Sequence, residues 1–273
     1  MNLLDAAILG IVEGVTEFLP ISSTGHLIVA ASLLGVHGSD KVKTFEIAIQ
    51  AGAIAAVLWA YWERFRGVFL ALPSDRSAQR FALNLILAFA PAALVGLLFS
   101  REIKTYLFNP VGVAIASVVG ALVIFWVERN PEAREARARI QSVDAMGPLD
   151  ALKIGLAQCA SLIPGISRSG ATLIGGMLFG MNRTSATEFS FFLGVPTLTA
   201  ASLFSLWKDW ALLTVEDLPA FAVGAVVSFL VALAVIRWLI RFVATHTLVA
   251  FAWYRILFGA LILLAAWTGW VQW

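Results

Sequence analysis

Long apolar stretches constrain this chain more than any other feature of its sequence. A helix needs roughly 20 apolar residues to cross a bilayer, and five stretches of about that length contain no Asp, Glu, Lys or Arg. A sixth, shorter stretch extends back through Glu46 and Phe45. We therefore predict six transmembrane helices, over residues 81–100, 105–127, 189–207, 218–236, 256–273 and 47–62.

Composition supports a membrane protein and excludes several other classes. Of the 273 residues, 60% are hydrophobic and 13% are charged, where a soluble domain carries roughly 25% charged residues. The net charge of +2 selects no polyanionic partner, and the single Cys159 excludes an internal disulfide framework and a cysteine-based metal site. A soluble globular enzyme, a disordered chain and a nucleic-acid-binding protein are thus excluded. We predict one all-α polytopic membrane domain over residues 1–273.

Two further apolar regions are interrupted by polar residues, Pro and Gly. Residues 1–34 are broken by EGVTEFLPISSTGH, and residues 149–180 by QCASLIPGISRSGAT. Irregular backbone at membrane depth is tolerated only where it lines a cavity within the protein. We therefore predict two re-entrant helix–loop–helix hairpins in addition to the six transmembrane helices.

The two hairpins resemble each other at an offset of 145 residues. GIVEGVTEFLPISSTG (10–25) aligns with GLAQCASLIPGISRSG (155–170), with matches such as Gly10 with Gly155 and Ser22 with Ser167. Each hairpin precedes three spans, an odd number, so the halves must have inverted topologies. We predict repeat one over about 1–127 and repeat two over about 149–273, joined by a cytoplasmic loop at 128–148. Inverted repeats place a shared site near the membrane midplane, at the broken helices.

Basic residues predict the orientation in the membrane. Loops 64–80, 128–153 and 237–247 hold 11 Lys and Arg, against 5 on the other side, and an excess of Lys and Arg marks the cytoplasmic side. The first hairpin then enters the membrane from outside and the second from the cytoplasm. The charged run at 128–139 is predicted to be a solvated cytoplasmic loop or short helix.

Glu13 and Glu17 are the acidic residues of the first hairpin. They lie one helical turn apart, and an ionisable residue inside a membrane is a functional hypothesis by default. A divalent ion would offset their repulsion, and Mg²⁺ commonly uses one or two carboxylates together with substrate phosphate. The alternative is that both side chains reach water outside the bilayer. Glu46 and Glu188, near the starts of their spans, are interpreted as structural.

Hydroxyl side chains precede an apolar run in each hairpin, as at a helix N-terminus. They are Ser22, Ser23 and Thr24 in the first hairpin, and Ser167 and Ser169 in the second. Free amide groups and the helix dipole favour a phosphate at such an end. Two ends that converge near the midplane would form an anion site, although each hydroxyl alone can serve merely as a cap.

Three more residues of these motifs suit phosphate chemistry. The planar guanidinium of Arg168 can hold two phosphate oxygens, or it can form a structural ion pair with Glu13 or Glu17. His26 follows Ser23 by one helical turn and can act as acid, base or ligand, or be a satisfied buried group. Thr172 lies four residues after Arg168 and can line the same face.

These motifs resemble those of a known family. EGVTEFLPISSTGH resembles the glutamate-rich motif of the undecaprenyl-diphosphate phosphatases, the bacitracin-resistance proteins of bacteria, and PGISRSGAT (164–172) resembles their second motif, PGxSRSxxT. The resemblance covers the whole chain in length, hydropathy and motif order. It implies a multi-pass protein of the bacterial cytoplasmic (inner) membrane, with an active site that opens to the outer, periplasmic side.

The resemblance also implies an activity. It is hydrolysis of undecaprenyl (C55 polyprenyl) diphosphate to undecaprenyl phosphate and inorganic phosphate, which recycles the lipid carrier for peptidoglycan and envelope synthesis and confers bacitracin resistance. It implies dependence on a divalent cation, Mg²⁺ or Ca²⁺. The partners are the polyprenyl diphosphate lipid and the bilayer, with no nucleic acid; the oligomeric state is open, and a homodimer is one option.

The residues are assigned roles on this basis. Glu13 and Glu17 hold the metal ion, and the diphosphate is bound by Ser22, Thr24, Ser167, Arg168, Ser169 and Thr172. Ser23 is the candidate nucleophile, with His26 or a glutamate handling protons, while Ser22, His26 and a metal-bound water remain alternative nucleophiles. The competing class is a transporter or flippase of a polyprenyl phosphate lipid, since broken helices in inverted repeats are typical of transporters. A non-catalytic scaffold would not explain Arg168 beside two glutamates.

Overall fold

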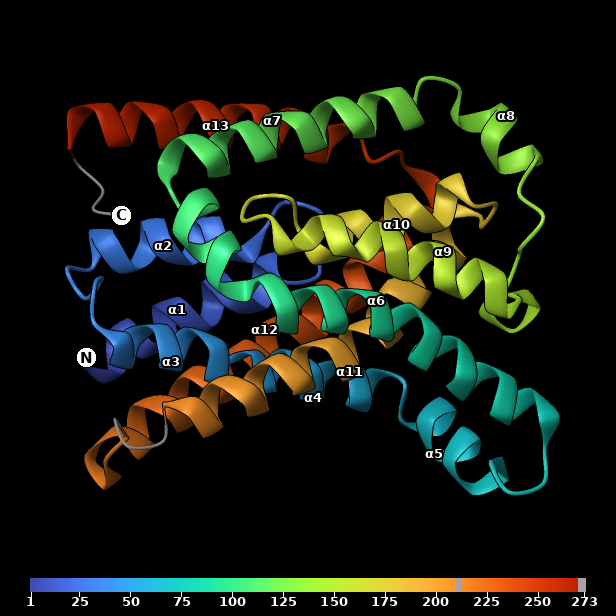
Figure 1. The fold of residues 1–273 in the computed structure, drawn as a ribbon, viewed down its shortest axis with the longest axis horizontal. Helices are drawn as coiled ribbons and strands as arrows, with labels where there is room; N and C mark the ends of the chain where they lie inside the picture. The colour runs from blue at the N-terminus through green and yellow to red at the C-terminus, as the bar shows by residue number, and fades with distance from the viewer. Residues whose placement is uncertain (210–212, 270–273) are drawn as a thin grey trace.

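The computed structural model describes residues 1–209 and 213–269, which are helical apart from loops and one isolated bridge between Ile140 and Met181 (Figure 1). Six helical segments of this part are long and apolar enough to cross a membrane, which confirms the predicted number. They are Asp40–Ala60, formed by α3 (Asp40–Ala48) and α4 (Gln50–Ala60); Arg76–Phe99, within α6 (Arg76–Leu107); α7 (Pro110–Val127); α11 (Arg183–Lys208); Val215–Thr245, which contains α12 (Leu218–Thr245); and α13 (Val249–Thr268).

Some predicted boundaries are wrong, because charge was used to delimit the spans. α6 continues to Leu107, and the next helix begins at Pro110 rather than at 105. Asn109 caps that helix by accepting a hydrogen bond from the Gly112 amide at 2.8 Å, and Pro110 fits the first helical turn. α13 begins at Val249, seven residues before the predicted 256, and the predicted end at 270–273 lies outside the described residues.

Each polar interruption separates two short helices, as predicted. α1 (Leu3–Thr16) and α2 (Ser23–Leu33) flank the first break, and α9 (Pro148–Gln158) with the short 3-10 helix η2 (Cys159–Leu162) precedes the second, which α10 (Arg168–Leu178) follows. The two breaks lie in contact, since the Ser169 hydroxyl donates to the Leu19 carbonyl at 2.8 Å. Segments almost 150 residues apart in sequence thus meet in the middle of the molecule (Figure 1).

The first helix of each pair packs closely on a long helix from the other half of the chain. α1 lies along α12, and α9 lies along α6. A Cβ atom at Gly10 would lie 2.6 Å from the Gly224 carbonyl oxygen, and one at Gly155 would lie 2.5 Å from that of Ala88. Larger side chains at these two positions would force the helices apart, so the glycines allow the close packing that holds the breaks in place.

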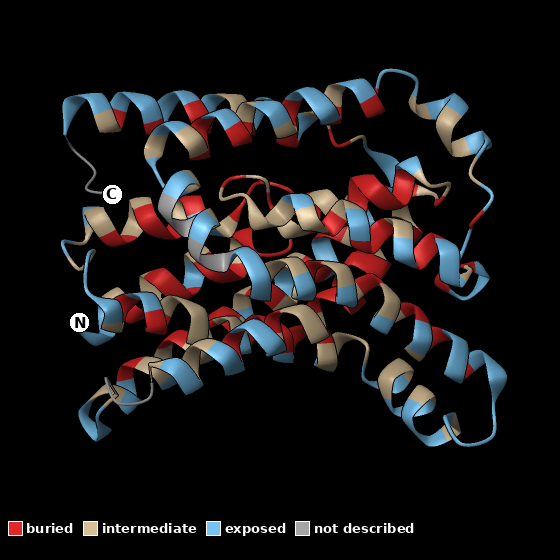
Figure 2. Ribbon diagram, viewed as in Figure 1, coloured by how far each residue is buried: buried red, intermediate tan, exposed pale blue. Residues whose placement is uncertain are grey.

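Buried residues concentrate around the breaks, whereas the outward faces of α6, α7 and α13 are exposed (Figure 2). Those faces carry large apolar side chains, such as Leu97, Leu122 and Leu257, which are 57–68% exposed. An exposed apolar surface of this extent is typical of a protein whose solvent is lipid. The polar centre is therefore enclosed by helices that face a bilayer.

The charged run after α7 is only partly the solvated segment that was predicted. It includes the short exposed helix α8 (Pro131–Ala136). Glu128, however, is 4% exposed and accepts two hydrogen bonds of 2.9 Å from Arg183 and one from the Leu248 amide. The bidentate ion pair compensates for the desolvation of both charges and ties α7 to α11 and to the start of α13.

Candidate active site

The candidate site lies where α2 and α10 begin, at the contact between the two breaks. Ser22 and Ser167 are the N-caps of these helices, with backbone φ angles of 73° and 69°. They are the only described residues besides glycine with positive φ, a conformation that costs free energy in an L-residue and is concentrated at functional sites. The predicted helix starts are confirmed, and two helix N-termini with free amide groups face the same region.

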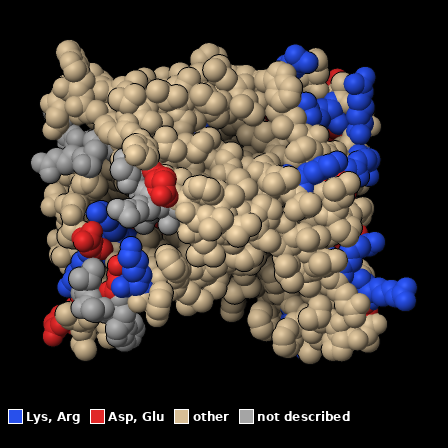
Figure 3. All heavy atoms as spheres, in the orientation of Figure 1, with Lys and Arg blue, Asp and Glu red and all other residues tan. Residues whose placement is uncertain are grey.

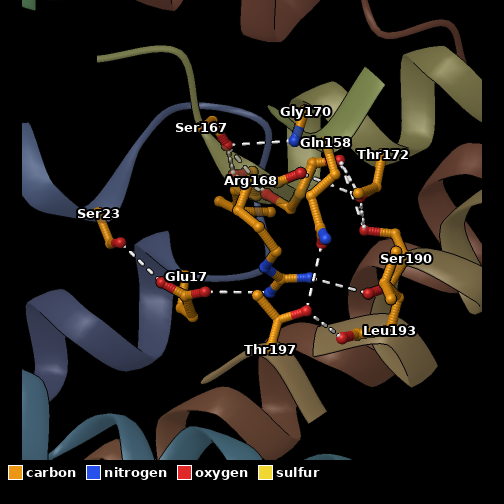
Figure 4. A network of polar contacts seen from close by, with 12 residues as sticks. Glu17, Ser23, Gln158, Ser167, Arg168, Gly170, Thr172, Ser190, Leu193 and Thr197 are labelled. Atoms are coloured by element: carbon orange, nitrogen blue, oxygen red, sulfur yellow. Dashed lines mark hydrogen bonds and ion pairs between the residues drawn. The ribbon is translucent and has the colours of Figure 1, made fainter. Parts of the chain in front are cut away.

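Arg168 links the two halves at this point (Figure 4). Its Nη2 donates to Glu17 Oε1 at 3.0 Å, and its Nη1 donates to the Ser190 carbonyl of α11 at 2.8 Å. Both side chains of the ion pair are less than a tenth exposed. The Nε of Arg168 is buried without a hydrogen-bond partner among the described residues. The predicted ion pair with a glutamate is present, and one donor remains available to a ligand.

Ser23 contacts the other oxygen of the same carboxylate. Its hydroxyl donates to Glu17 Oε2 at 2.7 Å (Figure 4), while Glu17 Oε1 is held by Arg168. Ser23 is partly exposed, whereas Glu17 is 6% exposed. A hydroxyl, a carboxylate that accepts its hydrogen bond and a guanidinium that orients the carboxylate form the arrangement that an activated nucleophile requires.

Glu13 lies one turn before Glu17 and is fully buried. Neither of its carboxylate oxygens has a hydrogen-bond partner among the described residues, and the same is true of Glu46 Oε1. A buried carboxylate without a partner is costly, which indicates that a cation or a proton accompanies it.

The donors suit a divalent cation that shares its ligands with a substrate. Within the described residues, no group of three or more His, Cys, Asp or Glu is arranged to hold a metal ion without other ligands. Glu13 and Glu17 nevertheless offer two carboxyl groups beside a single guanidinium, so the site would carry an excess of negative charge with both groups ionised and no cation bound. Mg²⁺ is typically bound by one or two carboxylates and completed by substrate phosphate and water.

His26 lies on α2 but belongs to a separate set of contacts. Its Nδ1 donates to the Ser22 carbonyl at 2.7 Å, since a carbonyl can only accept. In the neutral ring, Nε2 then accepts the hydroxyl of Tyr254, which lies at 2.6 Å. The imidazole also stacks on Phe258, with ring centroids 3.8 Å apart. Both ring nitrogens are thus engaged away from Ser23, and the catalytic role assigned to His26 stays a prediction.

The other predicted phosphate ligands differ in their accessibility. The Ser167 and Ser169 hydroxyls bond each other at 3.0 Å and lie near the Leu19 carbonyl, so they join the two breaks. Thr172 is buried, and its hydroxyl contacts the Ser190 hydroxyl at 2.6 Å. Thr24 is exposed. Ser22 is buried and makes no side-chain capping bond. Their role in binding phosphate stays a prediction.

Arg255 is the residue that the sequence reasoning missed. It lies in α13, is 1% exposed and has no acidic partner among the described residues. Its guanidinium donates five hydrogen bonds of 2.9–3.2 Å to backbone carbonyls, those of Pro20, Gly165, Ile166, Ala116 and Ser117. The first three belong to the two breaks, so Arg255 holds both breaks against α7 and α13. An arginine within an apolar run was the available signal.

Gly194 of α11 makes room for the Arg168 guanidinium, and it too was missed. A Cβ atom at this position would lie 2.8 Å from Nη1 and 3.0 Å from Nη2. No sequence pattern distinguishes this glycine from those that only allow helix packing.

The second hairpin has Gln158 at the position that aligns with Glu13 of the first. The amide group of Gln158 donates to the Ala88 carbonyl and accepts a hydrogen bond from the Thr197 hydroxyl, so it binds no charged group.

Comparisons with known proteins cover nearly the whole chain. The family model described as bacitracin resistance protein BacA matches residues 6–261. The undecaprenyl-diphosphatase of Albidiferax ferrireducens is 55% identical over 271 residues, which are 99% of this chain and 98% of that protein. The undecaprenyl-diphosphatase of Acidovorax ebreus is 56% identical over 271 residues, which are 99% of this chain and 97% of that protein. The undecaprenyl-diphosphatase of Methylibium petroleiphilum is 58% identical over 279 residues, which cover 99% of this chain and 98% of that protein. The matched region contains the entire candidate site.

Proposed function

The chain belongs to the bacitracin resistance protein BacA family, and we propose that it hydrolyses undecaprenyl diphosphate at the site formed by Ser23, Glu17 and Arg168. The products are undecaprenyl phosphate and inorganic phosphate, and the reaction confers bacitracin resistance. The single observation that carries the proposed mechanism is the Ser23–Glu17–Arg168 chain of hydrogen bonds at the start of two helices.

Substrate binding is assigned to Arg168 and to the two helix N-termini. The free Nε of Arg168 donates to a phosphate oxygen, which satisfies a buried donor that otherwise has none. The amide groups at the starts of α2 and α10 bind further oxygens, aided by the helix dipoles. The surrounding helices present apolar faces to the bilayer, and the prenyl chain of the substrate lies in the lipid beside them.

Ser23 is the proposed nucleophile. Its Oγ attacks the terminal phosphorus while its proton passes to Glu17 Oε2, the oxygen that it contacts at 2.7 Å. The bond between the terminal phosphorus and the bridging oxygen breaks, and undecaprenyl phosphate leaves with that oxygen. Arg168 keeps Glu17 in place and stabilises charge on the transferred group.

A water molecule completes the reaction. It attacks the phosphorus of the phosphoserine, and the bond between phosphorus and Ser23 Oγ breaks. Glu17 returns to Oγ the proton that it accepted in the first step, and the attacking water keeps its hydrogens as part of the released phosphate, so that the Ser23 hydroxyl and the Glu17 carboxylate are both regenerated. His26 holds the Ser22 carbonyl and so positions the strained turn that presents Ser23. We assign it this positioning role in preference to proton transfer.

Glu13 and Glu17 would hold a divalent cation, Mg²⁺ or Ca²⁺. The ion would neutralise charge on the diphosphate oxygens. The buried oxygens of Glu13, which have no partner among the described residues, support this assignment. Without an ion, the protein would have to keep Glu13 protonated beside Glu17.

The two breaks are proposed to be re-entrant hairpins of an inverted repeat, with repeat one at about 1–127, repeat two at about 149–273 and a cytoplasmic loop between them. α2 and α10 begin and end 145 residues apart, and so do the strained caps Ser22 and Ser167. The first helix of each repeat packs on a long helix of the other repeat: α1 of repeat one packs on α12 of repeat two, and α9 of repeat two packs on α6 of repeat one. In the inner membrane, the distribution of basic residues would direct the first hairpin, and with it the active site, to the outer side.

Phosphate release by the purified protein tests the proposal. Wild type in neutral detergent is given undecaprenyl diphosphate with Mg²⁺ or with a chelator, beside a Glu17→Gln variant. We expect metal-dependent release that the variant loses by roughly a hundredfold or more. Folded wild-type protein that releases no phosphate, but moves a polyprenyl phosphate lipid across vesicles, would instead identify a flippase.

A further inference from the structure

A cavity lined by arginines lies at the opposite end of α10 from the candidate active site. Its volume is about 380 Å³, and it is formed between the end of α7, the helix α8 and the end of α10. Three guanidinium groups line it, together with apolar side chains, and the principal residues are Arg129, Arg134, Arg137, Val127, Met177 and Leu178. We call it the basic cavity.

The charge of the basic cavity is not neutralised by its neighbours. Arg129 and Arg137 form no hydrogen bond or ion pair through their guanidinium groups within the described residues, and Arg134 uses its Nε to bond the Val127 carbonyl at 2.9 Å. Glu128, next to Arg129, is paired with Arg183. The two carboxylates of α8, Glu132 and Glu135, do not line the cavity and form no ion pair with its arginines within the described residues, and Glu135 accepts a hydrogen bond from the Arg183 amide at 3.4 Å. Several cationic groups therefore face one cavity without an anion.

The walls of the basic cavity also include apolar surface. Val127 and Met177 close its inner end and are buried, so the exposed apolar surface among these three residues is that of Leu178, which is 38% exposed. Trp126, the neighbour of Val127 on α7, is 51% exposed, and tryptophan is enriched at the level of lipid headgroups. A small hydrophilic anion would use only the guanidinium groups, whereas a lipid would contact both kinds of surface.

The position of the basic cavity in the molecule agrees with this chemistry. Lys and Arg side chains cover much of the end of the molecule that contains α8, with only small areas of Asp and Glu visible between them, and both signs of charge also occur at the other end (Figure 3). Basic pockets beside membrane helices bind the headgroups of acidic lipids. We propose that the basic cavity binds the phosphate of an acidic glycerophospholipid headgroup, with the lipid's acyl chains lying along the exposed apolar face of α7, which carries Val119, Leu122 and Trp126.

Lipid binding by matched variants tests this proposal. The protein is purified in neutral detergent, and bound lipid is counted by native mass spectrometry after addition of phosphatidylglycerol or phosphatidylcholine. We expect wild type to retain phosphatidylglycerol in preference to phosphatidylcholine, and the double variant Arg129→Gln/Arg137→Gln to bind it roughly tenfold or more weakly. The control Arg76→Gln/Arg237→Gln removes the same charge from two exposed arginines outside the basic cavity and should bind as wild type does.

Two outcomes would overturn the proposal. Equal loss of phosphatidylglycerol in the control variant would mean that net charge, not the basic cavity, retains the lipid. Displacement of the lipid by inorganic phosphate at the same concentration would mean that the cavity binds a free anion rather than a headgroup. Because the cavity residues take no part in the proposed hydrolysis, both double variants should keep wild-type phosphatase activity in detergent, which verifies that they are folded.

Discussion

Gly194 offers a way to move the Arg168 guanidinium without altering any group that touches substrate. In Gly194→Ala, the new Cβ would lie 2.8 Å from Nη1 and 3.1 Å from Cζ of Arg168. Non-bonded contacts need about 3.5 Å, so the guanidinium has to retreat by roughly 0.7 Å. Its hydrogen bonds to Glu17 and to the Ser190 carbonyl, now 3.0 and 2.8 Å, would then lengthen to about 3.5 Å or more, the limit of a hydrogen bond.

The expected cost falls on activity rather than on folding. Losing one hydrogen bond to a charged group removes about 1.5–3 kcal/mol of stabilisation, which corresponds to a decrease in kcat/KM of about 10- to 100-fold. Alanine is more favourable than glycine within a helix by about 1 kcal/mol, which offsets part of the loss in the folded state. The free energy of unfolding should therefore fall by less than about 2 kcal/mol.

Steady-state phosphate release and thermal unfolding in detergent measure the two effects. Gly67→Ala is the control, since a Cβ atom there would meet no other atom within 4 Å, and it should retain both activity and Tm. If Gly194→Ala keeps kcat/KM within about twofold of wild type at an unchanged Tm, the position of the Arg168 guanidinium does not limit the reaction and the reasoning is refuted.

Three other predictions concern residues around the site. Arg255→Met should lower Tm by several degrees and kcat by about tenfold or more, because backbone carbonyls of both breaks lose their donor; an active variant with unchanged Tm would show that the breaks hold themselves. His26→Phe should reduce kcat by only about tenfold and leave the pH profile of kcat unchanged, as a positioning role requires, and a shifted profile would restore His26 as a proton carrier. Hydrogen bonds from Arg139 hold the pKa of Asp150 below its ordinary value, so the stability they contribute is present at neutral pH and is lost as the pH falls below about 4. Asp150→Asn should flatten Tm between pH 3 and 6 relative to wild type, and parallel pH profiles would contradict the assignment.

The membrane spans and the two breaks were predictable because they rest on local patterns. Apolar length identifies a membrane helix, and Ser, Pro and Gly between two short apolar halves identify a break. The same reasoning placed Glu17, Ser23 and Arg168 at one site, because an aligned pair of breaks implies that they converge. The structure brings these three side chains into contact.

Other features depend on contacts that no local pattern encodes. Delimiting spans by charge moved the start of α13 past Arg255, although an arginine in an apolar helix is itself a signal. The charged run beginning at Glu128 was interpreted as solvated, but its partner Arg183 lies 55 residues away. Gly194 carries no signal at all, because only the three-dimensional structure places Arg168 against it.

The central claim is that Ser23 attacks the terminal phosphorus with Glu17 as its base. The most direct measurement is the turnover number of Ser23→Ala for undecaprenyl diphosphate in detergent with Mg²⁺, beside the control Ser228→Ala, which removes a buried hydroxyl that has no partner among the described residues. We predict a loss of roughly a thousandfold or more for Ser23→Ala and wild-type turnover for the control. A Ser23→Ala variant that turns over at a rate near that of wild type would contradict the covalent mechanism.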